Sequence, residues 1–290
     1  MIQSFIEGLM DYQFLQYALI TSMLVGLASG VIGSFIILRG MSLMGDAISH
    51  AVLPGVAISY MFGFSYILGA TAFGMLTAGI IGFVTQRSRL KNDTAIGIVF
   101  SSFFALGVIL ISFAQSATNL YHILFGNVLA VRESDMLMTA IVSGIVLLFV
   151  FIFYKELKIT SFDPMMAKAY GLNTTLVHYL LMFFLTLVAV VSLQTVGTIL
   201  VISMLITPAA TAYLLTDRLA KMIFISATVG VLSAIIGVFY SYSYNWPSGA
   251  TIVLTSAVFF TLAFLFSPTK GIIFSRNKTK KMPSRKKSNE

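Results

Sequence analysis

Two ionisable side chains stand four residues apart in residues 39–55, which read RGMSLMGDAISHAVLPG. If this segment is helical, Asp46 and His50 lie on one face about a turn apart, with Ser42 and Ser49 as nearby oxygen donors. An ionisable group at the middle of a bilayer costs about 2.5–3.5 kcal/mol, so an Asp in a membrane segment is by default a functional hypothesis. The four side chains therefore supply half of a cation site.

A structural explanation of the same residues stays open. An Asp near the start of a helix often caps that helix, and a membrane His often packs through a hydrogen bond. The pairing of Asp46 and His50 on one face favours the cation site, as do Pro54 and Gly55 just beyond, which would loosen the backbone.

The composition indicates an integral membrane protein. Of 290 residues, 58% are hydrophobic and 10% are charged, and the mean hydropathy is +0.95. Apolar runs of about 18–25 residues recur, each long enough to cross a bilayer as a helix, and they lack the alternation of barrel strands. The absence of cysteine excludes a disulfide framework, a thiolate metal site and haem attachment. The net charge of +8 lies in short polar clusters, which favour cytoplasmic loops and anionic lipid rather than nucleic acid.

The apolar runs predict an all-α bundle of about nine transmembrane helices, with eight to ten allowed. The expected spans are residues 14–38, 46–62, 67–84, 94–115, 136–154, 172–193, 196–214, 222–242 and 249–266, the seventh interrupted at Thr207 and Pro208. Basic loops follow every second span, which places the N-terminus outside and the C-terminus inside. Residues 40–45 are expected to be recessed below the membrane surface.

We expect residues 1–267 to form a single transmembrane permease domain. Residues 268–290 then form a basic, disordered cytoplasmic tail, with eight Lys or Arg and no acidic residue between positions 270 and 287. Such a tail would bind anionic membrane lipid, and the alternative is an inert signal that only fixes the orientation of the last span.

Three polar features have two interpretations each. Asp93 is best explained as a helix cap, with a direct role in transport as the alternative. His122 lies in a polar stretch, residues 116–135, which we expect to be external with a short, partly inserted helix; this histidine either assists metal entry or is an ordinary loop residue. Residues 161–173 contain a predicted short helix, 164–170, closed by Gly171, which either docks on a partner or simply connects two spans.

Four ordered motifs resemble a known family. RGMSLMGDAISHAVLPG, KNDTAIGIVFSSFFALG, ITSFDPMMAKAYG and QTVGTILVISMLITPAATAYLL closely resemble the membrane permease subunits of bacterial ABC importers for manganese, zinc and iron, and are most similar to the manganese branch. The resemblance covers about residues 15–266. It implies a multi-pass protein of the bacterial plasma membrane that works as a homodimer with two cytoplasmic ATP-binding subunits and an extracellular metal-binding protein.

The resemblance also assigns roles to residues. It implies that Asp46 and His50 contact the metal in the pathway, and that the segment with Asp163, Pro164, Ala167, Lys168 and Gly171 contacts the ATPase. No phosphate-binding loop is present, so the chain is expected to be a transport subunit and not an enzyme, without a permanently bound cofactor, and a partner must use the ATP.

The chemistry of the pair agrees with this assignment. Carboxylate oxygen and imidazole nitrogen suit Mn²⁺, Fe²⁺ and Zn²⁺, whereas a copper(I) site would use cysteine. Such ligands bind zinc more strongly than manganese, so selectivity must come in large part from the delivering protein. An ion-coupled secondary transporter would show inverted halves and more membrane carboxylates, and an intramembrane protease would need a second membrane aspartate. A purely structural subunit would leave Asp46 and His50 unexplained.

Overall fold

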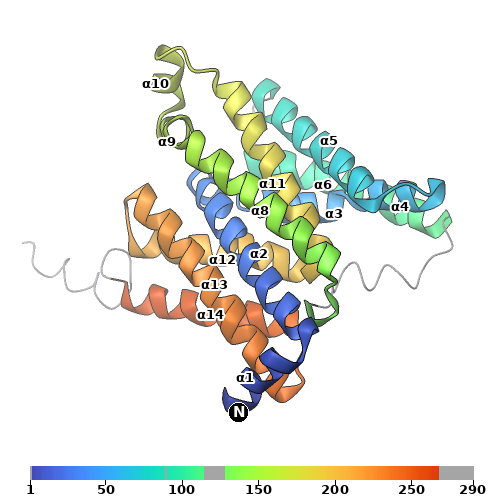
Figure 1. Cartoon of the computed structure of the whole chain (residues 1–290). Coiled ribbons are helices and arrows are strands. Elements are labelled where there is room, and N and C mark those ends of the chain that lie inside the picture. Colours follow the sequence, from blue (N-terminus) through green and yellow to red (C-terminus); the bar gives the residue numbers. More distant parts are fainter. Residues whose placement is uncertain (1, 89, 114–127, 268–290) are drawn as a thin grey trace, which may run out of the picture.

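The computed structural model describes residues 2–88, 90–113 and 128–267. Every regular element in these ranges is helical, which confirms the predicted all-α class (Figure 1). The helices are α1 (Ile2–Asp11), α2 (Gln13–Leu38), α3 (Met44–Ala51), α4 (Leu53–Phe62), α5 (Tyr66–Arg87), α6 (Asn92–Phe113), the short 3-10 helix η1 (Val128–Ala130), α8 (Glu133–Ile152), α9 (Tyr154–Phe162), α10 (Pro164–Ala169), α11 (Thr174–Val196), α12 (Thr198–Leu215), α13 (Leu219–Tyr244) and α14 (Ser248–Phe266).

Eight helices of the described ranges are long and apolar enough to cross a membrane: α2, α5, α6, α8, α11, α12, α13 and α14. The second span expected from the sequence is present as two shorter helices, α3 and α4, which meet at Val52. The number of spans therefore lies within the predicted range of eight to ten.

Pro54 explains the division of this span. A proline has no N–H, so Pro54 cannot donate the standard helical hydrogen bond to the carbonyl of His50. Pro54 instead occupies the first turn of α4, a position that proline tolerates. The predicted loosening of the backbone next to Asp46 and His50 is confirmed, and it makes α3 a separate eight-residue helix.

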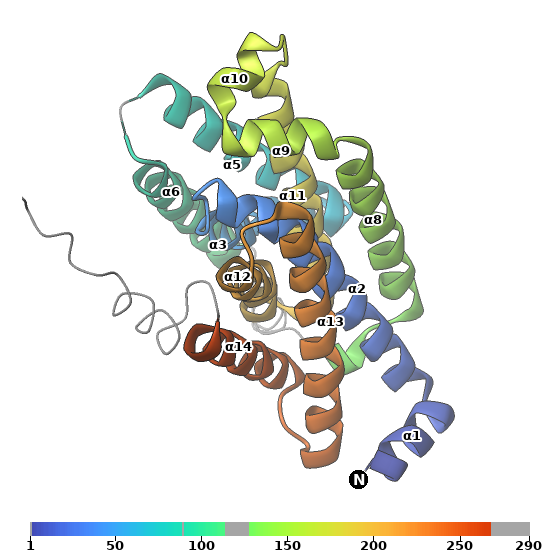
Figure 2. The same cartoon turned by 90° about the vertical axis from the view of Figure 1, so that its left-hand side faces the viewer.

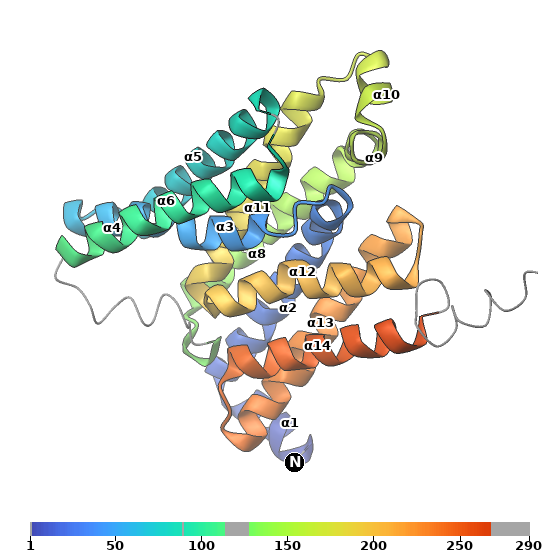
Figure 3. The same ribbon diagram turned by 180° about the vertical axis from the view of Figure 1, so that it is seen from behind.

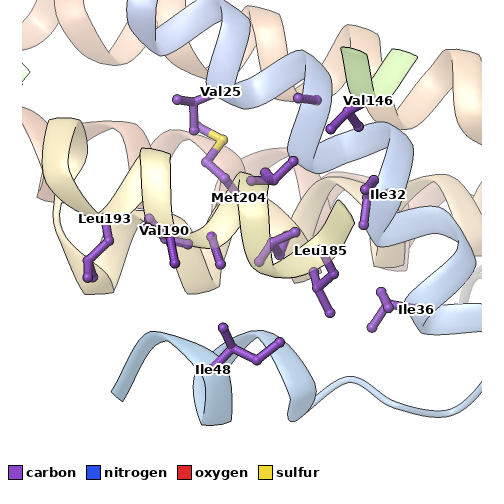
Figure 4. Close-up of a cluster of buried hydrophobic side chains, with 14 of the residues drawn as sticks. Val25, Ile32, Ile36, Ile48, Val146, Leu185, Val190, Leu193 and Met204 are labelled. Carbon is purple, nitrogen blue, oxygen red and sulfur yellow. The ribbon is translucent and has the colours of Figure 1, made fainter. Parts of the chain in front are cut away.

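Helix α2 forms the centre of the bundle and packs against α8, α11, α12 and α13. In its most apolar window, 72% of the residues are buried, against 17% for α6. Figure 4 shows how Val25, Ile32 and Ile36 of α2 gather with Met204 of α12 and Ile48 of α3. The apolar core thus extends onto α3, and burial of Ile48 holds that short helix in place.

The sequence-based prediction of an interruption at Thr207 and Pro208 is wrong. Helix α12 runs unbroken from Thr198 to Leu215 with Pro208 inside it. The lost N–H of a membrane proline is tolerated where neighbouring helices and hydroxyl groups satisfy the local backbone. Here α12 packs against α2, α13 and α14, and the hydroxyl groups of Ser203 and Thr207 lie 3.4 Å apart in the turn before the proline.

Two other expectations fall partly or wholly outside the described residues. The external stretch 116–135 is described only from Val128, as η1 and the start of α8, so His122 and the expected inserted helix lie outside the described ranges. The basic tail, residues 268–290, also lies outside them. The side of the membrane on which each terminus lies stays a prediction.

Glycines let the backbones of α2 and α13 approach each other directly. A Cβ atom added to Gly26 would lie 2.6 Å from the carbonyl oxygen of Gly230, and one added to Gly30 would lie 2.8 Å from that of Ser226. Both values are far below van der Waals contact, so no other residue fits without separating the helices.

We expect Gly26→Ala to lower the unfolding midpoint of the detergent-solubilised protein, because over-packing at a close contact costs about 1–3 kcal/mol. The matched control is Gly144→Ala on α8, where an added Cβ would meet nothing within 4 Å. Thermal unfolding followed by tryptophan fluorescence and gel filtration measures both variants. Equal midpoints for the two variants would show that the α2–α13 approach does not limit stability.

Candidate functional site

Helix α3 carries the predicted cation pair into the middle of the bundle. It lies between α6 and α12 (Figure 3) and also contacts α5 and α11. Asp46 lies in the first turn of α3 and His50 in the last, and the His50 Nε2 atom is 3.4 Å from the Asp46 Oδ1 atom. The structure thus confirms that the two side chains share one face of a helix.

Asp46 is not the N-cap residue of α3. That position belongs to Leu43, which makes no side-chain capping bond. The capping explanation of Asp46 is therefore wrong for this helix, and the carboxylate is available for another interaction. The Asp46 side chain is 37% exposed and that of His50 is 23% exposed, so both remain accessible in the single chain.

Two phenylalanines of α6 form the wall beside His50. The rings of Phe100 and Phe104 each have their centroids 5.6 Å from that of the imidazole. The Nδ1 atom of His50 is buried without a hydrogen-bond partner, so the Nε2 atom beside Asp46 is the nitrogen that can bind an ion. The packing explanation of His50 is thus only half right, because the ring packs but its buried nitrogen is not hydrogen-bonded.

Ser42 and Ser49 contribute less to the candidate cation site than the sequence suggested. Ser49 is buried, and its hydroxyl donates a 2.8 Å hydrogen bond to the Gly45 carbonyl within α3. Ser42 precedes the helix and is half-buried. No group of three or more His, Asp or Glu side chains that could hold a metal occurs among the described residues. Asp46 and His50 of one chain therefore offer two ligands and leave most coordination positions of a divalent ion open.

Asp93 was predicted to cap this helix, but α6 begins at Asn92, so Asp93 lies exposed inside the first turn and is not the N-cap residue. An acidic side chain there interacts favourably with the helix dipole. Its alternative role in transport stays untested.

The predicted short helix in residues 161–173 is present as α10. Asp163 caps it by accepting a 2.9 Å hydrogen bond from the Met166 N–H, and Pro164 occupies the first helical position. At the other end Gly171 adopts a left-handed φ of 79°, and the N–H groups of Gly171 and Leu172 bond the carbonyls of Lys168 and Ala167. This pair of bonds is a Schellman motif, so both ends of α10 are fixed by their own sequence.

The residues of α10 face different surroundings. Ala167 is fully buried within the chain itself, so this small residue lies at the contact between α10 and the rest of the bundle. The outer face of α10 is formed by the residues next to Ala167. Met165, Met166 and Tyr170 are 84%, 52% and 68% exposed, and Lys168 is exposed with them. This apolar outer face was not predicted from the sequence, although the two adjacent methionines in a polar loop are its visible signal.

Arg39 directly follows the first predicted span, residues 14–38, and the structure gives it a specific contact. Its Nε atom donates to the Ser161 Oγ atom at 3.0 Å, and its Nη2 atom donates to the Thr160 Oγ1 atom at 2.9 Å. Burial lowers the pKa of Arg39 to about 10, which still leaves the guanidinium charged at neutral pH. The end of α2 is thereby tied to the last turn of α9.

Comparisons with known proteins agree with this architecture. The model of the ABC 3 transport family matches residues 11–267. The manganese transport system membrane protein MntC of Listeria innocua is 66% identical over 94% of this chain and 98% of its own length. The manganese import system permease protein ScaB of Streptococcus gordonii is 55% identical over 92% of this chain and 96% of its own length.

A solved structure has the same fold. PsaBC from Streptococcus pneumoniae, determined in complex with Fab, contains a chain that is 54% identical to this one, with a TM-score of 0.86. The match covers 97% of the present chain and all of the other.

We expect Asp163→Ala to loosen α10 without unfolding the bundle, because loss of an N-cap side chain costs about 1 kcal/mol. Hydrogen exchange of residues 164–170 should become roughly fivefold faster, while exchange in α2 stays unchanged. The control is Asn173→Ala, which removes the cap of α11 (Asn173 Oδ1 to Leu176 N, 3.0 Å) and leaves α10 intact. Unchanged exchange in α10 would show that this cap is not needed.

Proposed function

The chain belongs to the ABC 3 transport family, and from this premise we propose that it is the membrane permease of an ATP-driven importer that brings Mn²⁺ into a bacterial cell. The observation that carries the proposal is the identity of 66% over nearly the whole chain to a manganese transport membrane protein. The chain is a multi-pass protein of the plasma membrane and a transport component, not an enzyme.

Asp46 and His50 are the proposed contacts of the transported ion. The carboxylate supplies negative charge and the His50 Nε2 atom supplies a nitrogen ligand, and the two atoms that face each other lie 3.4 Å apart. The phenylalanine wall of α6 lowers the local polarity, which strengthens the attraction between the ion and the carboxylate. Hydrated ions would enter on the more exposed Asp46 side.

The small number of ligands suits transport. An ion held by two protein ligands leaves more readily than one held by a full set, and the open positions take water or groups from another chain. We propose a two-fold symmetric pair of permeases, in which the face bearing Asp46 and His50 of each chain lines a shared central pathway. Zn²⁺ and Fe²⁺ fit the same ligands, so the choice of Mn²⁺ depends on the extracellular binding protein that delivers it.

The cytoplasmic ATP-binding subunits are proposed to dock on α10. Both Figure 1 and Figure 2 place α9 and α10 at the opposite end of the bundle from α1. This position agrees with an external N-terminus and a cytoplasmic α10, as the distribution of basic loops predicts. The exposed Met165, Met166 and Tyr170 offer the apolar surface that such a contact needs.

Metal uptake by the assembled transporter in vesicles tests the cation pair. Asp46→Asn removes the charge and His50→Ala removes the nitrogen, and each should lower ATP-dependent Mn²⁺ uptake by at least about tenfold, since loss of even a supporting group costs 10–100-fold in metal affinity. Asp11→Asn, which changes an exposed aspartate at the end of α1, is the matched control and should leave uptake unchanged. Normal uptake by either site variant, at equal assembly, would refute the assignment.

Co-purification tests the docking surface. Met165→Glu should reduce recovery of the ATP-binding subunit with the permease by about tenfold, because a charge would be buried in an apolar contact. Met10→Glu is the matched control: Met10 is 78% exposed, but it lies on α1 at the far end of the bundle. If both variants retained the subunit equally, the docking surface would have to be sought outside α10.

A further inference from the structure

Arg39 stands at a junction between the centre of the bundle and the segment that carries Asp46. It is the C-cap of α2, and the N–H groups of Gly40 and Met41 bond the carbonyls of Ile37 and Ile36 in a second Schellman motif. Gly40 has a left-handed φ of 65°, and α3 begins only a few residues later, at Met44. A fixed backbone therefore connects Arg39 to α3.

The partners of Arg39 stand at an equivalent junction. Thr160 and Ser161 occupy the last turn of α9, and Asp163, the residue after that helix, caps α10. A single residue, Asp163, therefore joins the end of α9 to the start of α10. The guanidinium then connects that turn to the end of α2, more than 120 positions away in the sequence.

The hydroxyl groups are oriented to accept from Arg39. Thr160 Oγ1 donates to the Glu156 carbonyl at 2.7 Å and Ser161 Oγ donates to the Leu157 carbonyl at 2.6 Å. Both hydroxyl protons are therefore donated within α9, and the lone pairs of the two hydroxyl oxygens can accept hydrogen bonds from the guanidinium. The planar guanidinium bonds both oxygens at once, which fixes direction as well as distance.

Arg39 makes no ion pair with an acidic side chain in the described part of the chain. Its charge is instead half-buried at the contact between α2 and α9, where it also lies within electrostatic range of His178 on α11. A half-buried charge without an ionic partner carries a desolvation penalty, which a purely structural contact between α2 and α9 would not require.

We propose that Arg39 is a positioning residue that transmits the movement of α10, through the last turn of α9, to the segment carrying Asp46 and His50. The inference deepens the proposed function and rests on it. Arg39 does not touch the ion: it sets the position of α3 relative to the docking helix. Loss of the contact uncouples hydrolysis in the partner from ion movement in the bundle.

The test measures Mn²⁺ uptake and ATP hydrolysis in the same vesicles, which hold the full transporter and are supplied with its binding protein. Arg39→Met should lower the number of ions moved per ATP hydrolysed by at least about tenfold while hydrolysis stays within about twofold of wild type. Arg39→Lys keeps the charge but loses the planar guanidinium that bonds both hydroxyls at once. Its ratio of ions moved to ATP hydrolysed should therefore lie between those of wild type and Arg39→Met. A merely structural role would lower both rates together and leave the ratio unchanged.

Removal of the acceptors tests the same contact from the other side. The double variant Thr160→Val, Ser161→Ala should lower the ratio as Arg39→Met does, and adding Arg39→Met to it should produce no further loss. Thr228→Val is the matched control, because the Thr228 hydroxyl also donates to a carbonyl of its own helix, that of Phe224 at 2.8 Å, and is exposed. Its ratio should equal that of wild type.

The outcomes separate this inference from the function beneath it. Wild-type vesicles without ATP-driven Mn²⁺ uptake would refute the proposed function itself. Wild-type uptake together with a normal ratio in Arg39→Met, or a proportional fall in both of its rates, would overturn the inference alone. If Arg39→Met did not assemble, the double variant Thr160→Val, Ser161→Ala, which retains the charge of Arg39, would replace it. A lower number of ions moved per ATP hydrolysed in that variant would support the inference, and a normal number would overturn it.

Discussion

The structure depends on keeping an aspartate and a histidine among helices that are otherwise apolar. Such polar side chains are costly wherever a helix bundle faces lipid, so they must be held at a place that protein or water lines. The bundle holds them by packing α3 between α6 and α12 and by burying Ile48 in the common core with α2. The apolar contacts of α3 thus maintain the position of its two polar side chains.

The surrounding helices keep their own polar groups away from the pair. Many buried hydroxyls donate to a carbonyl one turn earlier in the same helix, as Ser22, Ser34 and Thr186 do. Such bonds satisfy the hydroxyl without competing for Asp46 or His50. Close backbone approach at Gly26 and Gly230 then lets α2 and α13 pack tightly, and the Ser226 hydroxyl donates a 2.7 Å hydrogen bond across this contact to the Gly30 carbonyl.

Local features of the chain were predictable from the sequence because their causes are local. The length of each apolar run gave the spans, Pro54 gave a loosened backbone but not the division of the second span into two helices, and Pro164 with Gly171 gave both ends of α10. Pro208 was misjudged because α12 continues through it where the helix packs against α2, α13 and α14, and that packing is not visible in the local sequence.

Features that depend on distant parts of the chain were not predictable. The contact of Arg39 with Thr160 joins residues 121 positions apart, and the wall of Phe100 and Phe104 beside His50 comes from a helix two spans away. Ala167 was expected to serve the partner, yet it is buried within its own chain. A six-residue helix such as α10 is too short for a hydrophobic period to show which of its side chains face the bundle, so only tertiary packing could reveal that Ala167 is buried.

The incomplete ligand set connects the site with the movement of the chain. In the proposed site α3 provides only two ligands, so the affinity for an ion would depend on what else approaches Asp46 and His50, whether water or groups from another chain. A small shift of α3 then changes the set of ligands and not merely the length of existing bonds, so the site responds in a stepwise manner. Separation of α3 from α4 at Pro54 permits such a shift without bending a full-length helix, and the fixed turn at Arg39 determines where it begins. Under the proposed coupling, the two-ligand set makes occupancy sensitive to the position of α3, and the contact of Arg39 with the last turn of α9 controls that position.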